Sequence, residues 1–348
     1  MNVFRAIVAV GLLSGACSGA DSPLRLAVGK SLTYLTDGGR EWMEDRNCVS
    51  CHHTPMTIWS LHHAKQNGFT VDEETLAKVM AWSLDPKLRL MPRPPEKKVA
   101  PEPEAKGEKP EAADPGADNP PFDATYFILA TDRVEPSFVP APTRAILVRK
   151  LLDKQEADGS WLSYVAHPPM LDRGETTTLN VLLALLGKDG KCEPTDPDWN
   201  GRKTQALEFL AKSKPSDELQ PKLWRLLLRK YLGPTANLPG TQAEEVKVIL
   251  GQQHADGGWG QTPALPSDAF ATGQVLYLLT AADCQISPET RTKAIGFLLK
   301  NQQADGSWLM ASRARLLPKP SAGAGNLDMI RYAGTAWAAM GLISIAGK

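Results

Sequence analysis

The chain has no excess of charge of either sign. Its 348 residues carry 39 Lys and Arg against 39 Asp and Glu, so the formal net charge is zero. Composition therefore gives no argument for binding to nucleic acid or to an anionic membrane, because both require a basic surface. Beyond the N-terminus the sequence also lacks an apolar run of the roughly 20 residues that a membrane-spanning helix needs. The length suits one large domain or two small ones.

Cysteine is scarce too, with five residues in the chain. Only Cys48 and Cys51 form a Cys-x-x-Cys pair, and no second such pair or His-x-x-x-His pair completes the four ligands of a structural zinc site. Cys192 and Cys284 would form a disulfide only in an oxidising compartment and only within reach of each other. We expect them to be two separate thiols.

The Cys pair belongs to the stretch Asn47-Cys48-Val49-Ser50-Cys51-His52-His53. Cys-x-x-Cys-His is the pattern that attaches a c-type haem. The two thiols add to the vinyl groups on one porphyrin edge, and the following imidazole, that of His52, becomes an axial ligand of the iron. A vicinal redox pair and half of a zinc site are the alternative interpretations. We therefore predict haem c, held by Cys48, Cys51 and His52.

The N-terminus has the features of an export signal. A short basic start, Met1–Arg5, precedes the apolar run Ala6–Leu13, which is too short to span a bilayer. Small residues then offer cleavage sites, and we predict a signal peptide over residues 1–20. A variant of this prediction has Cys17 exposed by cleavage and carrying a lipid anchor. Export to an extracytoplasmic location agrees with haem c, because bacteria attach this haem outside the cytoplasm.

Internal repeats dominate the second half of the chain. Gln155-Glu156-Ala157-Asp158-Gly159-Ser160-Trp161 recurs with its Gln at 253 and its Trp at 259, and again with its Gln at 302 and its Trp at 308. A degenerate copy ends at Asp217. The aspartates at 158, 217, 256 and 305 are spaced by an average of 49 residues. Such a period indicates repeated units that bury their apolar faces only against each other.

Each unit reads as two helices, one amphipathic and one more apolar, with the Asp-Gly turn ending the first. The expected amphipathic, outer segments are 23–35 with 39–46, 72–83, a helix around 145–152, 198–212, 241–252 and 287–302. The expected apolar, inner helices are 54–66, 123–131, 176–186, 220–231, 269–282 and 328–346. Thr54 is the expected N-cap of the first inner helix. Residues 91–121, rich in Pro, Glu and Lys, read as a disordered insert in a single domain spanning 21–348.

The three Gln-x-x-Asp-Gly-x-Trp repeats resemble the QW motifs of the squalene–hopene cyclase and protein prenyltransferase superfamily. The segments 267–274 and 333–338 also resemble it, and with the Cys-x-x-Cys-His-His motif they resemble an exported bacterial subgroup. The resemblance implies an all-α (α/α)6 toroid of six helical hairpins. It also implies that the motif residues are structural, with Trp stacked on Gln; these are Gln155, Trp161, Trp259 and Trp308.

Known chemistry of this superfamily is missing from the sequence. The cyclases protonate a polyene with an Asp-x-Asp-Asp motif, and the nearest match, Asp196-Pro197-Asp198, reads as a turn and helix cap. The prenyltransferases use zinc bound by Asp, Cys and His, and Cys192 and Cys284 lack such partners. The pattern therefore favours a protein without either activity, although the fold is shared.

A sixth haem ligand would come from loops at the same end of the ring as the motif. His167 and Met170 are the preferred candidates, with Met91, His254 and Met310 also on that face, and an open iron is equally compatible with the sequence. Other charged and aromatic residues have dual interpretations. Arg46 and Arg173 would form ion pairs either with haem propionates or with carboxylates at the surface. Trp42, Met56 and Trp59 would pack either on the porphyrin or in the protein core. His62 and His63 read as helix surface or lining.

Three functions follow from these patterns. The first is an exported monohaem protein that transfers electrons or acts in redox chemistry with an unidentified partner. The second is a toroid that binds a lipid, a peptide or another small apolar ligand, with haem as a structural element. The third is an isoprenoid-modifying enzyme with an unrecognised acid.

Overall fold

The computed structural model describes residues 22–46, 49, 53–85, 122–133, 139–162, 168–170, 174–191, 193–214, 216–311, 313 and 327–346. These residues form an all-α structure with twelve α-helices. The predicted signal peptide, the predicted insert and the motif residues Cys48, Cys51 and His52 lie outside the described residues. Within the described part, no helix has the length and apolar character to cross a membrane.

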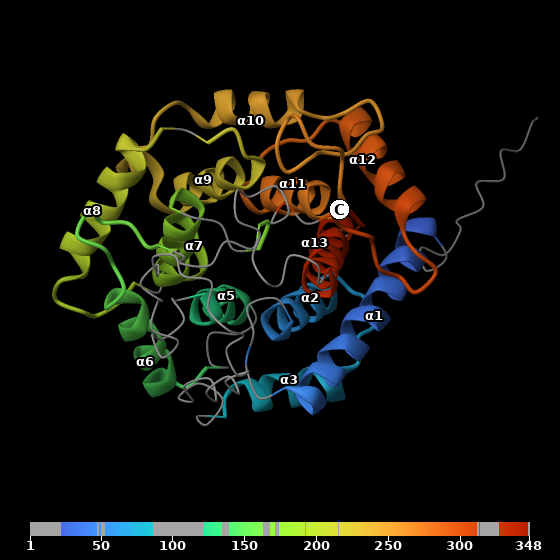
Figure 1. Ribbon diagram of the computed structural model, residues 1–348, viewed down its shortest axis with the longest axis horizontal. Coiled ribbons are helices and arrows are strands. Elements are labelled where there is room, and N and C mark those ends of the chain that lie inside the picture. The colour runs from blue at the N-terminus through green and yellow to red at the C-terminus, as the bar shows by residue number, and fades with distance from the viewer. Residues whose placement is uncertain are drawn as a thin grey trace, which may run out of the picture.

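The helices alternate between an outer and an inner layer (Figure 1). The outer helices are α1 (Pro23–Asp45), α3 (Glu73–Ser83), α6 (Ala141–Leu152), α8 (Trp199–Lys212), α10 (Gln242–Gly251) and α12 (Pro288–Asn301). The inner helices are α2 (Thr54–Gln66), α5 (Phe122–Thr131), α7 (Glu175–Leu186), α9 (Leu219–Leu232), α11 (Ala269–Ala281) and α13 (Asp328–Ala346). The predicted helices are confirmed to within a few residues at each boundary.

Two details differ from the prediction. The segments expected at 23–35 and 39–46 form one continuous helix, α1, because Gly38 and Gly39 are accommodated within it rather than ending it. The N-cap of α2 is His53 and not Thr54, so Thr54 and Pro55 occupy the first two helical positions. Proline suits that first turn, where its missing N–H has no partner to lose.

The inner helices contact one another in cyclic order. Each packs on the next in the chain, and α13 packs on both α11 and α2, which brings the end of the chain back to its beginning. The closest crossing is between α11 and α13, where a Cβ on Gly273 would lie 2.3 Å from the backbone of Trp337. Glycine is required here because two helix backbones touch.

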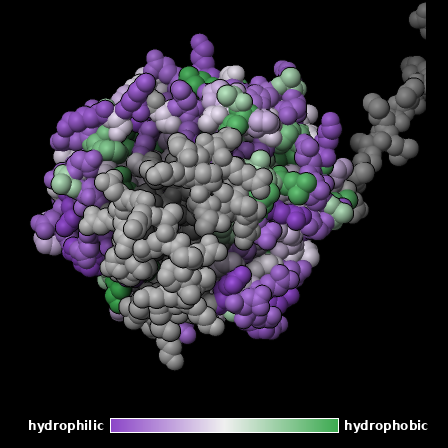
Figure 2. Space-filling model, viewed as in Figure 1, coloured by the Kyte–Doolittle hydropathy of each residue, from purple (hydrophilic) through white to green (hydrophobic). Residues whose placement is uncertain are grey.

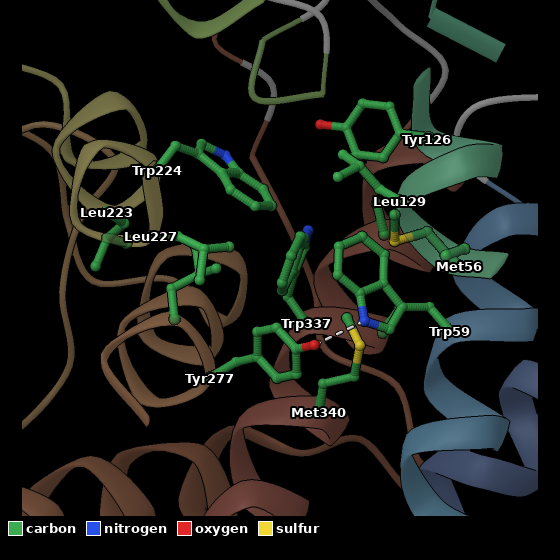
Figure 3. Close-up of a cluster of buried hydrophobic side chains, with 14 of the residues drawn as sticks. Met56, Trp59, Tyr126, Leu129, Leu223, Trp224, Leu227, Tyr277, Trp337 and Met340 are labelled. Carbon is green, nitrogen blue, oxygen red and sulfur yellow. Dashed lines mark hydrogen bonds between the residues drawn. The ribbon is translucent and has the colours of Figure 1, made fainter. Parts of the chain in front are cut away.

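Large side chains fill the centre of the inner layer (Figure 3). Trp337 lies among Trp59, Trp224 and Tyr277, with ring centroids 5.3–5.9 Å away and steeply inclined planes. Trp59 Nε1 donates a hydrogen bond of 2.8 Å to Tyr277 Oη. Such edge-to-face contacts are favourable geometries for aromatic rings. The described centre is therefore a packed core.

The three repeated turns adopt one geometry. In each, the indole N–H donates to a carbonyl in the last turn of the preceding outer helix: Trp161 to Leu151, Trp259 to Ile249 and Trp308 to Leu298. The Gln side chain spans its own turn and reaches the next outer helix: Gln155 to Arg202, Gln253 to Thr290 and Gln302 to Ala27. These hydrogen bonds and the burial of the three tryptophans bear out a structural role for the motif residues, with the Gln amide tying neighbouring outer helices together. The predicted stacking of Trp on Gln stays a prediction.

The last of these turns joins the two ends of the chain. Gln302 Nε2 lies 2.8 Å from the carbonyl of Ala27 in α1. Gly306, at a φ of +88°, sits so close that a Cβ would lie 2.3 Å from the Lys30 carbonyl. Only glycine combines this left-handed backbone with this approach.

The degenerate copy replaces its tryptophan with an arginine from another element. Arg225 of α9 is buried and donates from Nη2 to the carbonyl of Leu210, which aligns with Leu298 in the repeat. Its Nε also donates to Glu175 at the start of α7. A buried guanidinium thus caps α8 where an indole caps α6, α10 and α12, and the carboxylate compensates its charge.

The outer surface is mainly hydrophilic around the rim of the face seen in Figure 2, with scattered apolar residues. Among the described residues, the large apolar side chains that are well exposed lie on separate elements: Leu26, Ile146, Leu162, Val248 and Leu309. Isolated residues of this kind are normal for a protein surface.

We predict that Gly306→Ala lowers the free energy of unfolding by about 3 kcal/mol or more, because it forces a Cβ into the Lys30 carbonyl at a strained φ. The matched control is Gly296→Ala in α12, where the added Cβ meets nothing within 4 Å and should stabilise the helix by about 0.5–1 kcal/mol. Urea unfolding measures both. Equal stabilities for the two variants would refute the tight closure.

Candidate cofactor site

The Cys-x-x-Cys-His motif lies in the connection between α1 and α2. Its flanks are described: Arg46 follows the last residue of α1, Val49 is buried, and His53 caps α2. This connection lies at the end of the ring where the inner helices begin, as do the repeated turns. The structure therefore describes the residues that flank the motif in the sequence, and haem binding by Cys48, Cys51 and His52 stays a prediction.

Helix α1 extends further beyond the repeated contacts than the equivalent outer helix α12 does. The contacts of Gly306 with Lys30 and of Gly257 with Lys293 align α1 with α12, so Leu35 corresponds to Leu298. Beyond these positions α12 has three further residues, to Asn301, whereas α1 has ten, to Asp45. Trp42 lies in this additional part of α1, which ends three residues before Cys48.

Three rings are stacked directly beside the motif. The His53 imidazole lies between Trp42 and Tyr332, with centroids 4.2 Å from each and interplanar angles of 17° and 19°. Because Trp42 comes from α1 and Tyr332 from α13, the stack joins the first hairpin to the last inner helix. His53 is therefore held by protein contacts on both faces of its ring.

Tyr332 is the anchor of this stack. Its hydroxyl lies 2.6 Å from the Leu35 carbonyl and 2.6 Å from Thr57 Oγ1. Burial raises the pKa of Tyr332 well above its ordinary value, so the phenol keeps its proton. The Leu35 carbonyl is the one that corresponds to the indole-capped carbonyl of Leu298. Tyr332 therefore bonds the carbonyl of α1 that corresponds to the one bonded by Trp308 in α12, although α1 continues beyond this position.

The predicted sixth ligands are only partly described. His167 and Met91 lie outside the described residues. Met170 is buried, and its carbonyl accepts a hydrogen bond of 3.4 Å from Tyr126 Oη. Met310 is buried against Gly334 of α13. His254 Nδ1 lies 3.0 Å from Ser267 Oγ, so its ring is engaged beside the repeated turn. Because Cys48, Cys51 and His52 lie outside the described residues, the ligand role of Met170 stays a prediction.

Of the two arginines predicted to pair with haem propionates, one lies within the described residues and the other does not. Arg46 places its guanidinium carbon 5.6 Å from the centroid of the Trp42 ring, a cation–π distance. Arg173 lies outside the described residues. Met56 and Trp59 are buried core residues of α2. Arg46 is thus close to the motif and stacked on the extension of α1.

A polar network near the same end was not foreseen from the sequence. Arg313 pairs with both oxygens of Glu218, at 2.8 and 3.0 Å, and donates to Gln261. Gln261 in turn donates to Asp268, the N-cap of α11. Burial raises the pKa of Asp268 to about 6, opposed by the hydrogen bond from the Ala271 amide. These four side chains come from separate parts of the chain, so spacing alone does not reveal them.

The carboxylate pair nearest to the cyclase motif is a surface turn, as predicted. The Asp196 side chain accepts from the Asp198 amide and pairs with Arg149 at 2.7 Å. Asp198 is the N-cap residue of α8, as predicted, and its backbone carbonyl accepts from the Arg202 amide, although its side chain makes no capping hydrogen bond. Within the described residues, no three His, Cys, Asp or Glu side chains gather as a metal site. Cys284 is a free thiol there and Cys192 is not described.

His62 and His63 lie at the opposite end of the ring, near the C-terminus of α2, where both border a pocket. His63 Nε2 is 2.9 Å from Ser344 Oγ, and its ring meets Tyr277 edge-on at 5.1 Å. Burial lowers the pKa of His63 to about 4, with further contributions from His62 and Arg133. The imidazole is therefore neutral at neutral pH.

Neither a protein-family model nor a curated protein sequence matches this chain.

We predict that the protein loses about 2 kcal/mol of stability between pH 7 and pH 5 because of His63. The unfolded chain takes up a proton near pH 6.5, whereas the folded imidazole resists protonation until about pH 4, so the stability present above pH 6.5 is lost on acidification. His63→Gln, which keeps a partner for Ser344, should lose less. Urea unfolding at both pH values measures the difference.

The control is Ser344→Ala, which removes the hydrogen bond but keeps the imidazole. Its free energy of unfolding should fall between pH 7 and pH 5 by about as much as that of the unmodified protein. If the free energy of unfolding of His63→Gln falls with pH as much as that of the unmodified protein, another group is responsible.

Proposed function

We propose that this protein is an exported monohaem c-type protein with a role in electron transfer or other redox chemistry. Its helices are proposed to form the (α/α)6 toroid of the squalene–hopene cyclase and prenyltransferase superfamily. Cyclic contacts among the inner helices and the shared geometry of the repeated turns support this assignment.

The residues that would hold the haem are Cys48 and Cys51 through thioether bonds, and His52 through the iron. The described flanks fit this group. Helix α1 continues to Asp45, shortly before the motif, and Trp42 on it supplies an aromatic ring that stacks on His53, the residue directly after the motif. When bound, the haem would supply a centre that gains and loses one electron.

The observation that carries the proposal is the stack of Trp42, His53 and Tyr332. Two histidines follow Cys51, and the stack fixes the second of them between two rings. The neighbouring His52 is then the histidine left for the iron, as the motif requires. Arg46 and Trp42 would shape the electrostatics and packing at the porphyrin edge.

The alternative functions have less support. A lipid-binding or polyene-processing toroid needs space at its centre, and the described centre is filled by the rings around Trp337. The carboxylate nearest to a cyclase acid, Asp196, is paired with Arg149. Export, with a signal peptide over 1–20 and lipidation at Cys17 as its variant, places the protein outside the cytoplasm in this proposal.

We predict that the full chain, expressed with haem-maturation machinery, carries one covalent haem detectable in a pyridine haemochrome spectrum. Cys48→Ser and Cys51→Ser should each weaken or abolish the attachment, because each removes one thioether bond. Without covalent haem in the unmodified protein, the proposal is wrong.

Two adjacent histidines give a matched comparison. His52→Ala should remove the axial ligand and shift the Soret and visible bands, whereas His53→Ala should keep the unmodified spectrum and lose stability by about 1–2 kcal/mol from the lost ring contacts. Spectra and urea unfolding of both variants test this. The reverse spectral result would assign the iron to His53.

A further inference from the structure

A pocket opens at the end of the ring opposite to the motif. It has a volume of about 160 Å³ and lies among the C-terminal ends of the inner helices and the short 3-10 helix η2 (Lys188–Gly190). Its chemistry comes from six residues of its lining: Trp59, His63, Arg133, Lys188, Tyr231 and Tyr277. Neither the repeated turns nor the haem motif accounts for it.

Arg133 is the charged group in this pocket. It follows α5, is partly buried and donates to two neutral acceptors, the Leu129 carbonyl at 3.0 Å and Tyr231 Oη at 3.2 Å. Its guanidinium carbon also lies 4.8 Å from the centroid of a Trp59 ring. The adjacent Asp132 pairs instead with Arg144, at 3.0 Å.

Within the described residues, no carboxylate forms an ion pair with Arg133, whereas most other arginines of the inner layer do, such as Arg225 with Glu175 and Arg229 with Glu245. A partly buried charge without a counter-ion is costly. A guanidinium also matches a planar carboxylate with its fork of N–H donors. Besides its neutral acceptors, Arg133 has the nearby charge of Asp132, which is engaged with Arg144. An anionic ligand would therefore supply the direct ion pair that Arg133 lacks within the described residues.

The surrounding groups are donors and flat apolar walls. Tyr231 and Tyr277 each accept a hydrogen bond, from Arg133 and from Trp59 respectively, so both phenol protons remain to donate elsewhere. Lys188 adds a second cation at the exposed rim, beside Asp189, whose carboxylate limits the charge there to near neutral. His63 is neutral. The specific attraction for an anion therefore centres on Arg133.

Size restricts the ligand. A cavity of roughly 150 Å³ accommodates benzene, and this pocket is of similar volume. Aromatic rings on its walls favour a flat apolar body. We propose that the pocket binds a small organic carboxylate with a flat apolar body, its carboxylate on Arg133 and its body against Trp59 and Tyr277.

The test compares benzoate with its neutral analogue benzamide on the purified full chain, with its haem if attached. Isothermal calorimetry and Trp fluorescence measure binding at constant ionic strength. Charge-assisted hydrogen bonds contribute about 1.5–3 kcal/mol, so benzoate should bind roughly tenfold or more tightly than benzamide. Equal affinities, no binding of benzoate, or equally tight binding of inorganic phosphate would overturn the proposal.

Variants locate the site. Arg133→Gln should weaken benzoate binding about tenfold or more, and Tyr231→Phe should weaken it less while keeping the fold. Arg331→Gln is the control, because Arg331 lies at the motif end and pairs with Asp305, and it should leave benzoate affinity unchanged. Unchanged affinity in both pocket variants would place binding elsewhere. The haem spectrum reports separately on the proposed redox function, so either can fail alone.

Discussion

The hydrogen bond from Gln302 to the Ala27 carbonyl is the contact on which the arrangement of this protein depends. The same Gln contact joins α6 to α8 and α10 to α12, but only the last one connects distant parts of the chain. The inner layer closes as well, because α13 packs against both α11 and α2, so every inner helix has two inner neighbours. A helix pair with two neighbours buries both of its lateral faces, which isolated pairs cannot do.

Closure also brings the last inner helix against His53, the residue that follows the Cys-x-x-Cys-His motif. Tyr332 belongs to the last inner helix, yet it caps the Leu35 carbonyl of α1 and stacks on His53. The first hairpin lacks the turn that follows α6, α10 and α12, and the stack of Trp42, His53 and Tyr332 lies at the corresponding connection. Motif and fold are thus coupled through residues from the two ends of the chain.

Much of the fold was predictable from sequence because its signals are local. Asp-Gly turns, caps such as Ser287 and the apolar character of α11 act within a few residues, and the helix bounds agree closely with the predictions. The candidate site was predictable only as a motif. Tyr332, Arg133 and the network of Asp268 with Arg313 act through contacts between distant positions, which a single sequence does not encode as a spacing. Arg225 shows the same limit, since an arginine from α9 performs the task of a missing tryptophan.

The contact between Thr57 and Tyr332 joins residues 275 positions apart. The first hairpin, which carries the motif, is therefore synthesised long before the helix that locks it in place. Contacts of such long range form late and slowly, because the intervening chain must first be ordered. A covalent modification at Cys48 and Cys51 would thus have a time window in which the motif has emerged but its partner from α13 has not yet arrived.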